Sequence, residues 1–174
     1  MAIALVALGS NVGDAMGHIQ TAVRLLERHV SVLSISPVYE TEPMYVVDQP
    51  NFLNAALAAQ TSCGPMRLLS ILKQIEREVG RLQSERYGPR EVDLDLIAYG
   101  SLIFEHWADD RLVLEVPHPR APERRFVLQP LADVAPDGFL PGLGKITDLL
   151  EATKHQATSV QRRDDVALSL HSVR

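Results

Sequence analysis

The sequence predicts an α+β fold in which helices pack against an antiparallel sheet. Two observations support this prediction. Short apolar runs typical of strands alternate with stretches in which apolar residues recur every three to four positions, as in amphipathic helices. The chain has 174 residues, of which 46% are hydrophobic and 22% charged, the composition of an ordinary globular domain. We therefore expect one domain with a sizeable core.

The elements follow one another in a recognisable order. Residues 2–8 are continuously apolar and stop at Gly9, as a buried strand does, whereas Ile19, Ala22, Val23 and Leu26 share one helical face. In order, we expect a strand at 2–8, a helix at 15–29, a strand at 30–40, a loop at 42–50, a strand at 52–60, a helix from 65 to 79, and a strand at 92–99 that turns at Gly100 into a short hairpin partner. This βαββαβ order is the split βαβ, or ferredoxin-like, arrangement.

The remaining chain is less strongly patterned. Residues 117–119 form a proline-rigid segment, and helices are expected at 124–133 and 146–153. Residues 154–174 are polar, and we expect a partly disordered tail there. The predicted domain is therefore a single unit over residues 1–153.

Charge and cysteine content exclude several classes of protein. The formal charge is -5 and the pI about 5.6, so the basic excess of a duplex-binding protein is missing. Cys63 is the single cysteine, which excludes an internal disulfide and fits a reducing compartment. No apolar run is long enough for a membrane span or a signal segment, so we expect a cytoplasmic protein.

The strongest chemical signal is the segment RYGPREVDLDLI at residues 86–97. In a strand, Asp93 and Asp95 point to the same face, and their Cα atoms lie about 7 Å apart. Paired carboxylates repel each other unless a cation is present, and their hard oxygen atoms suit Mg²⁺. Arg81, Arg86 and Arg90 precede them, so the segment either clamps a polyphosphate or forms a solvated surface network of opposite charges.

A second pattern joins an aromatic ring to an amide. Phe52 and Asn54 are two positions apart at the start of a strand and therefore share a face. A ring offers a stacking surface, and an amide offers a donor and an acceptor, so the pair suits a flat heterocycle. The alternative is an ordinary core phenylalanine beside an asparagine that binds nearby backbone.

The third candidate is His118, which lies between Pro117 and Pro119 and so has a restricted backbone. A single histidine is more often structural than functional. The sequence lacks the G-x-S-x-G elbow of a serine hydrolase and the ligand spacing of a zinc enzyme. It also lacks the glycine motifs of Walker and Rossmann nucleotide sites.

Taken together, these motifs resemble the 6-hydroxymethyl-7,8-dihydropterin pyrophosphokinase family over roughly residues 2–150. The matching segments are AIALVALGSN at 2–11, YETEP at 39–43, DQP at 48–50, FLN at 52–54, the segment 86–97, LEVPHPR at 114–120 and ERRFVL at 123–128. The resemblance implies a ferredoxin-like fold with αβα layers. It also implies transfer of pyrophosphate from ATP to the pterin hydroxymethyl group, releasing AMP, in folate biosynthesis.

The resemblance also assigns roles to residues. Asp93 and Asp95 are implied to hold two Mg²⁺ ions, with ATP as co-substrate and with Arg81, Arg90 and Asp95 as the catalytic set. The nucleotide-binding positions are Glu76, Arg81, Arg90, His118 and Arg124. The pterin-binding positions are Thr41, Glu42, Met44, Phe52, Asn54, Asp95 and Phe126. The implied partners are these two small molecules, with neither nucleic acid nor membrane, and the implied state is a monomer.

Three residues depart from the family pattern: Gln83 replaces a common arginine, Tyr45 a glycine, and Tyr87 a residue that is tryptophan in some members. These departures affect loop contacts and loop closure. Two other functions compete with this interpretation. A non-catalytic ferredoxin-like module that senses a nucleotide or metabolite would leave Asp93 and Asp95 without a role. A glycosyltransferase with a D-x-D motif is usually longer than this chain.

Overall fold

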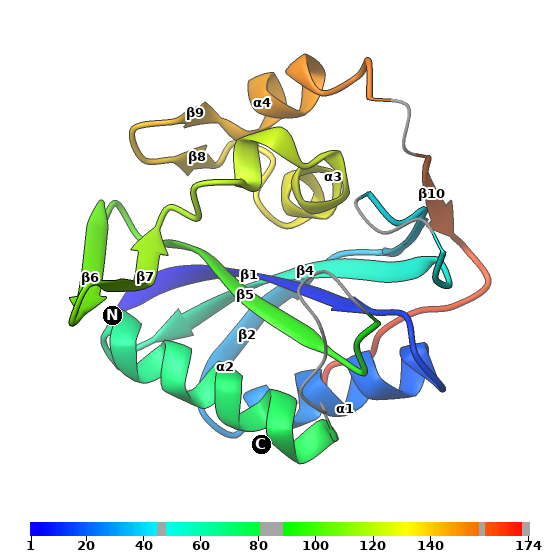
Figure 1. The fold of residues 1–174 in the computed structure, drawn as a ribbon, viewed down its shortest axis with the longest axis horizontal. Coiled ribbons are helices and arrows are strands. Elements are labelled where there is room, and N and C mark those ends of the chain that lie inside the picture. Colours follow the sequence, from blue (N-terminus) through cyan, green and yellow to red (C-terminus); the bar gives the residue numbers. More distant parts are fainter. Residues whose placement is uncertain (45–47, 81–88, 157–158, 172–174) are drawn as a thin grey trace.

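The structure, a computed structural model, describes residues 1–44, 48–80, 89–156 and 159–171. Its centre is an antiparallel sheet in the order β10-β3-β4-β1-β5, with β2 also paired to β4 (Figure 1). The sheet strands are β1 (Ala2–Ser10), β2 (Ser31–Ile35), β3 (Val38–Thr41), β4 (Phe52–Thr61), β5 (Asp93–Tyr99) and β10 (Val160–Arg163). The ferredoxin-like α+β prediction is confirmed.

Helices cover both faces of the sheet. Helices α1 (Ala15–Leu26) and α2 (Pro65–Val79) lie on one face, and α3 (Arg125–Val134) lies on the other, with α4 (Ile146–Ala152) packed beside it (Figure 1). This gives the αβα layers that the resemblance implied. The alternation of side chains along β4 sends Leu57 into the core under α1 and α2, and Ala56 and Ala58 into a second core under α3.

Local chemistry sets the limits of the two larger helices. The Asp14 carboxylate accepts a hydrogen bond of 3.0 Å from the Gly17 amide and caps α1. Helix α2 begins with Pro65 at its first position and ends at Gly80, whose φ of 110° strongly favours glycine. The predicted helices at 15–29 and 65–79 are therefore correct, except that the last turn predicted for α1 is not helical.

The strand predicted at 30–40 is divided into β2 and β3. Pro37 lacks an amide hydrogen and interrupts the ladder. At the break, the Ser36 amide donates to the Ala56 carbonyl, and the Ala56 amide donates to the Ser36 hydroxyl oxygen, each at 2.9 Å. Both short strands consequently remain paired to β4.

The short partner expected after Gly100 does not pair with β5. β6 (Phe104–Ala108) pairs instead with β7 (Arg111–Val116) as a separate hairpin, whose turn places Asp109 at a φ of 51°. The chain continues through a 3₁₀ turn at Ala121–Glu123 to α3, and a small ladder of β8 (Phe139–Leu140) and β9 (Gly144–Lys145) precedes α4. Among the described residues, no helix is long and apolar enough to cross a membrane.

The polar segment 154–174 contains a strand that the sequence pattern did not predict. β10 pairs antiparallel with β3, with Val160 opposite Thr41. Farther on, Leu168 packs against the core under α1 and α2, and the Ser169 amide donates to the Gln20 side chain at 2.9 Å. The described part of this segment therefore runs from the edge of β3 to α1.

Candidate functional site

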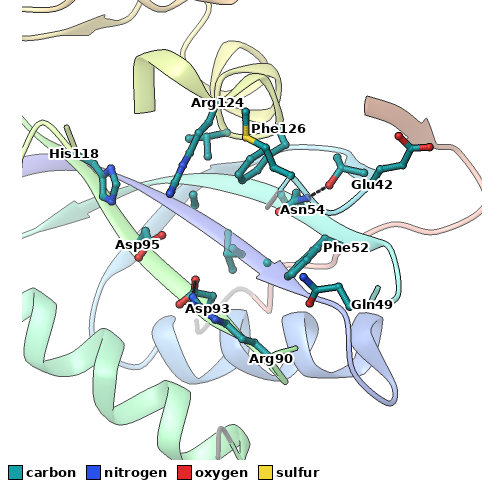
Figure 2. Close-up of a pocket in the computed structure, with 17 residues that line it drawn as sticks. Glu42, Gln49, Phe52, Asn54, Arg90, Asp93, Asp95, His118, Arg124 and Phe126 are labelled. Atoms are coloured by element: carbon teal, nitrogen blue, oxygen red, sulfur yellow. Dashed lines mark hydrogen bonds and ion pairs between the residues drawn. The ribbon is translucent and has the colours of Figure 1, made fainter. Parts of the chain in front are cut away.

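A cavity of about 220 Å³ opens on the face of the sheet that carries α3 (Figure 2). Its polar and aromatic lining comes from β3, β4, β5, the start of α3 and the connecting segments. The lining residues are Ala7, Leu8, Gly9, Thr41, Glu42, Met44, Gln49, Phe52, Asn54, Ala55, Arg90, Asp93, Asp95, His118, Arg124, Phe126 and Val127. Eleven of the residues singled out from the sequence thus surround one space.

Two small residues of β1 occupy the middle of the cavity floor. Gly9 pairs with Asn54 of β4 on one side and with Asp93 of β5 on the other, and Ala7 pairs with Asp95. A Cβ atom at position 9 would lie 3.1 Å from the Asn54 Oδ1 atom, closer than nine in ten natural Cβ contacts. Small side chains on the central strand therefore leave room for a ligand to extend from Asn54 to the aspartates, a Cα span of about 10 Å across two strand spacings.

The aromatic and amide groups form one half of the cavity. Asn54 lies between Phe52 and Phe126 (Figure 2), and its Nδ2 atom donates to the buried Thr41 hydroxyl at 2.6 Å. This bond fixes the orientation of the amide. The result is a stacking site with a directed hydrogen-bonding edge.

The carboxylates and cations form the other half. Asp93 and Asp95 extend from the same face of β5, as predicted, and Arg90 forms an ion pair with Asp93. Removal from water raises the pKa of the Asp95 carboxyl above its usual value, and the Asp93 carboxylate raises it further. A cation bound here would relieve this repulsion.

His118 and Arg124 complete the charged half of the cavity (Figure 2). The His118 amide donates to the Ile97 carbonyl at 2.8 Å, and its Nδ1 atom accepts the Arg120 amide at 3.2 Å. Burial lowers the pKa of His118, and Arg124 adds to this effect, so the ring is neutral near pH 7 with its hydrogen on Nε2. Arg124 is the residue immediately before α3, and its guanidinium carbon lies 5.8 Å from the centre of the Phe126 ring.

Two predicted residues are not seen at the cavity. Arg81 lies outside the described residues, as do Arg86, Gln83, Tyr45 and Tyr87. Glu76 is on α2, against the opposite face of the sheet, and is only 3% exposed. Its carboxylate accepts the Leu94 amide and the Lys73 ammonium, so the structure places it beneath β5 and not among the cavity-lining residues.

The sequence analysis did not assign a role to Asn11, which joins three segments beside the cavity. Its Nδ2 atom donates to the Gln49 side chain and the Pro50 carbonyl, at 3.1 and 3.0 Å, and its Oδ1 atom accepts the Arg90 amide at 2.9 Å. Gln49 itself lines the cavity. The sequence signals for Asn11 were its place just beyond a buried strand and its inclusion in the segment 2–11 that resembles the family.

The fold and the cavity define a class: a ferredoxin-like αβα domain with a cavity whose lining combines aromatic, amide, carboxylate and cationic groups. The family model described as 7,8-dihydro-6-hydroxymethylpterin-pyrophosphokinase (HPPK) matches residues 5–136. The chain belongs to this family.

Curated relatives agree with this assignment. The chain is 45% identical to the 2-amino-4-hydroxy-6-hydroxymethyldihydropteridine pyrophosphokinase of Bacillus subtilis, over 76% of this chain and 77% of that protein. It is 47% identical to the mitochondrial folate synthesis bifunctional protein of Arabidopsis thaliana, over 75% of this chain but 23% of that protein. The chain thus spans about a quarter or less of several of these relatives, which are longer proteins.

Solved structures support the fold. The crystal structure of wild-type Plasmodium falciparum HPPK-DHPS superposes with a TM-score of 0.70, covering 87% of this chain and 44% of that one, at 16% identity. At this identity the likeness concerns the fold alone.

Proposed function

We propose that this protein transfers pyrophosphate from ATP to the hydroxymethyl group of 6-hydroxymethyl-7,8-dihydropterin, releasing AMP, as a step of folate biosynthesis. One observation carries the proposal: a single cavity places an aromatic and amide half next to a carboxylate and cation half, across a floor of small residues. The pterin and the triphosphate would occupy these two halves.

The pterin would lie between Phe52 and Phe126, because a flat ring system gains stacking contacts on both faces. Asn54 would bind its amide-like edge, since Thr41 already holds the amide in one orientation. Glu42 and Met44 also line this half and would complete the recognition of the pterin. The hydroxymethyl group would then extend over Gly9 towards β5.

The other half suits ATP with two Mg²⁺ ions. The described residues contain no cluster of three or more His, Cys, Asp or Glu ligands, so the protein would supply Asp93 and Asp95 while phosphate oxygens and water complete the coordination. Burial raises the pKa of the Asp95 carboxyl and the nearby Asp93 carboxylate raises it further, and a cation between the two would offset both effects. Bound Mg²⁺ would neutralise phosphate charge and polarise the phosphoryl oxygens.

The chain's own residues would mainly position and neutralise the reactants. Arg90 and Arg124 would bind phosphate oxygens, the His118 Nε2 hydrogen would be a further donor, and Asp95 would orient the hydroxymethyl group. The hydroxymethyl oxygen would form a bond to the β-phosphorus, and the bond from that phosphorus to the bridging oxygen would break, so that AMP leaves with this oxygen. The proton of the hydroxyl group would pass to solvent. We also propose for Arg81 the catalytic and nucleotide-binding role that the family resemblance implies.

The wider assignments are proposals as well. We propose a cytoplasmic monomer, in keeping with the lone Cys63 and the two small-molecule substrates. Residues 1–153 would form the pyrophosphokinase domain. Residues 154–174 would act as an extension, of which β10 supports the edge of β3.

The decisive experiment is a product assay with ATP, Mg²⁺ and 6-hydroxymethyl-7,8-dihydropterin. We expect equal amounts of AMP and pterin diphosphate, and no AMP when the pterin is omitted. Formation of ADP, or ATP hydrolysis that does not depend on the pterin, would contradict the proposal. Binding of both ligands without any product would instead favour a sensing module.

A further inference from the structure

The outer edge of β5 is supported by two side chains instead of a neighbouring strand. β5 is the last strand of the sheet on its side, and among the described residues no strand pairs with its outer edge at Leu94. The Leu94 amide donates to Glu76 Oε1 at 2.8 Å, and Lys73 Nζ donates to the Leu94 carbonyl at 3.2 Å. Both side chains come from α2, which packs on β5.

Lys73 and Glu76 also bind each other. Lys73 Nζ lies 2.7 Å from Glu76 Oε1, so the two side chains and the two backbone groups of Leu94 form a closed ring of hydrogen bonds. The ring reproduces the donor and acceptor that an adjacent strand would present. Glu76 is only 3% exposed, and a carboxylate buried to this degree needs such partners.

Leu94 is the residue between Asp93 and Asp95. Its amide belongs to the peptide group shared with Asp93, and its carbonyl belongs to the peptide group shared with Asp95. Holding both groups fixes the two peptide planes, and thereby the direction in which each aspartate side chain leaves the strand. The contact therefore acts on the geometry of the carboxylate pair, although it lies on the opposite face of the sheet.

We propose that Lys73 and Glu76 are positioning residues that hold the Asp93 and Asp95 carboxylates in the arrangement that binds the metal and nucleotide. The inference rests on the proposed function only in taking these carboxylates as the metal ligands. Outer groups that orient metal ligands commonly contribute about 10-fold to 100-fold in metal affinity. We expect the lower end of this range, because the contact acts through the backbone.

The direct test is hydrogen exchange at the Leu94 amide, measured by NMR on the full chain. In Glu76→Ala we expect the exchange of this amide to accelerate at least about 10-fold, because its acceptor is lost. Glu76→Gln keeps an oxygen acceptor and should restore most of the protection. The control is Glu78→Ala on the same helix, because Glu78 is exposed and binds Gln74 instead of the strand.

The second readout is binding of a non-hydrolysable ATP analogue as a function of Mg²⁺ concentration. In Glu76→Ala the half-saturating Mg²⁺ concentration should rise about 10-fold. The rise should be smaller in Glu76→Gln. In both variants the affinity for the pterin, measured without nucleotide, should not change. Lys73→Met, which keeps the Glu76 acceptor, should give a smaller change of the same sign. It also serves as the test variant if Glu76→Ala does not fold.

The outcomes separate this inference from the proposed function. If exchange at the Leu94 amide is faster but the Mg²⁺ dependence of binding is unchanged, Lys73 and Glu76 have a purely structural role and the proposal is wrong. Unchanged exchange at the Leu94 amide would also overturn the proposal. If both readouts shift but the wild-type protein forms no AMP, the positioning role holds and the proposed function fails.

Discussion

At the scale of single residues, the site depends on what is small as much as on what is charged. Gly9 and Ala7 lie on the central strand between Asn54 and the two aspartates, where any larger side chain would divide the cavity. The aromatic and charged groups that suggested a function from sequence can contact one ligand because the side chains at these two positions are small.

The Asp95 carboxylate provides the first test at this scale. We expect Asp95→Ala to lower turnover about 100-fold or more, because a proposed metal ligand and substrate-orienting group is lost. Pterin binding in the absence of nucleotide should survive, since Phe52, Asn54 and Phe126 remain. Steady-state kinetics and pterin fluorescence titration measure the two effects, and turnover near the wild-type rate would refute the metal assignment.

Tyr39 provides a test of pH dependence. Its hydroxyl donates to Asp133 at 2.7 Å, and burial together with this contact raises its pKa from 10.0 to about 12. The unfolded chain therefore loses the proton first. The stability due to Tyr39 is complete below pH 10, declines above it and is lost as the pH rises through 12.

Urea unfolding of the wild type and Tyr39→Phe between pH 8 and pH 12 measures this effect. The variant should be less stable by about 1 kcal/mol at pH 8, since it lacks the hydrogen bond to Asp133. The difference should shrink above pH 10, while the other titrating groups largely cancel between the two proteins. A difference that stayed constant to pH 12 would contradict the raised pKa.

Sequence patterns predicted the relative positions of the candidate site residues well where these residues lie on one strand. The alternation of side chains was enough to place Asp93 beside Asp95, and Phe52 beside Asn54. Glu76 and Asn11 show the limit, because their partners are backbone groups 18 and 79 residues away, respectively. Backbone amides and carbonyls have no sequence signature, so such contacts are visible only in three dimensions.

At the scale of elements, β10 is the feature with a consequence for binding. It covers the outer edge of β3, with Val160 opposite Thr41, and Arg163 forms an ion pair with Glu40. Glu40 also accepts the Asn51 side chain at 3.0 Å, so one carboxylate ties β10 to both ends of segment 42–50. Part of the cavity lining is in that segment.

A chain that ends at Gln156 tests this support. We expect pterin affinity to fall about 10-fold, because β3 loses its outer neighbour and Thr41 its fixed position, whereas nucleotide affinity should be nearly unchanged. A chain that ends at Asp165 is the control, since it retains β10 but lacks Leu168 and Ser169. Equal pterin affinity in all three chains would show that β10 does not contribute.

Local patterns predicted most helices and strands, because helical periodicity and the residues that end helices and strands act within a few positions of the chain. Pairing partners were harder to predict. The hairpin expected to include β5 forms between β6 and β7, and β10 was missed because its four residues include one apolar side chain, Val160. An edge strand with both charged and polar residues gains its stability from backbone hydrogen bonds, which a hydrophobic pattern does not record.

At the scale of the whole molecule, the two faces of the sheet have different tasks. The face under α1 and α2 is a continuous apolar core, and the face under α3 combines a smaller core with the cavity. The net charge of -5 conceals this arrangement, since Arg90 and Arg124 converge on one site that also contains Asp93 and Asp95. Whole-chain charge therefore could not reveal an anion site.

The pairing of β10 with β3 also bears on how the protein is made. The two strands are separated by more than 110 residues, so during synthesis β3 can be paired with β4 long before residues 160–163 leave the ribosome. A nascent chain would thus carry its main sheet with one side still open. The pterin half of the cavity would be completed only after residues 160–163 have emerged and paired with β3.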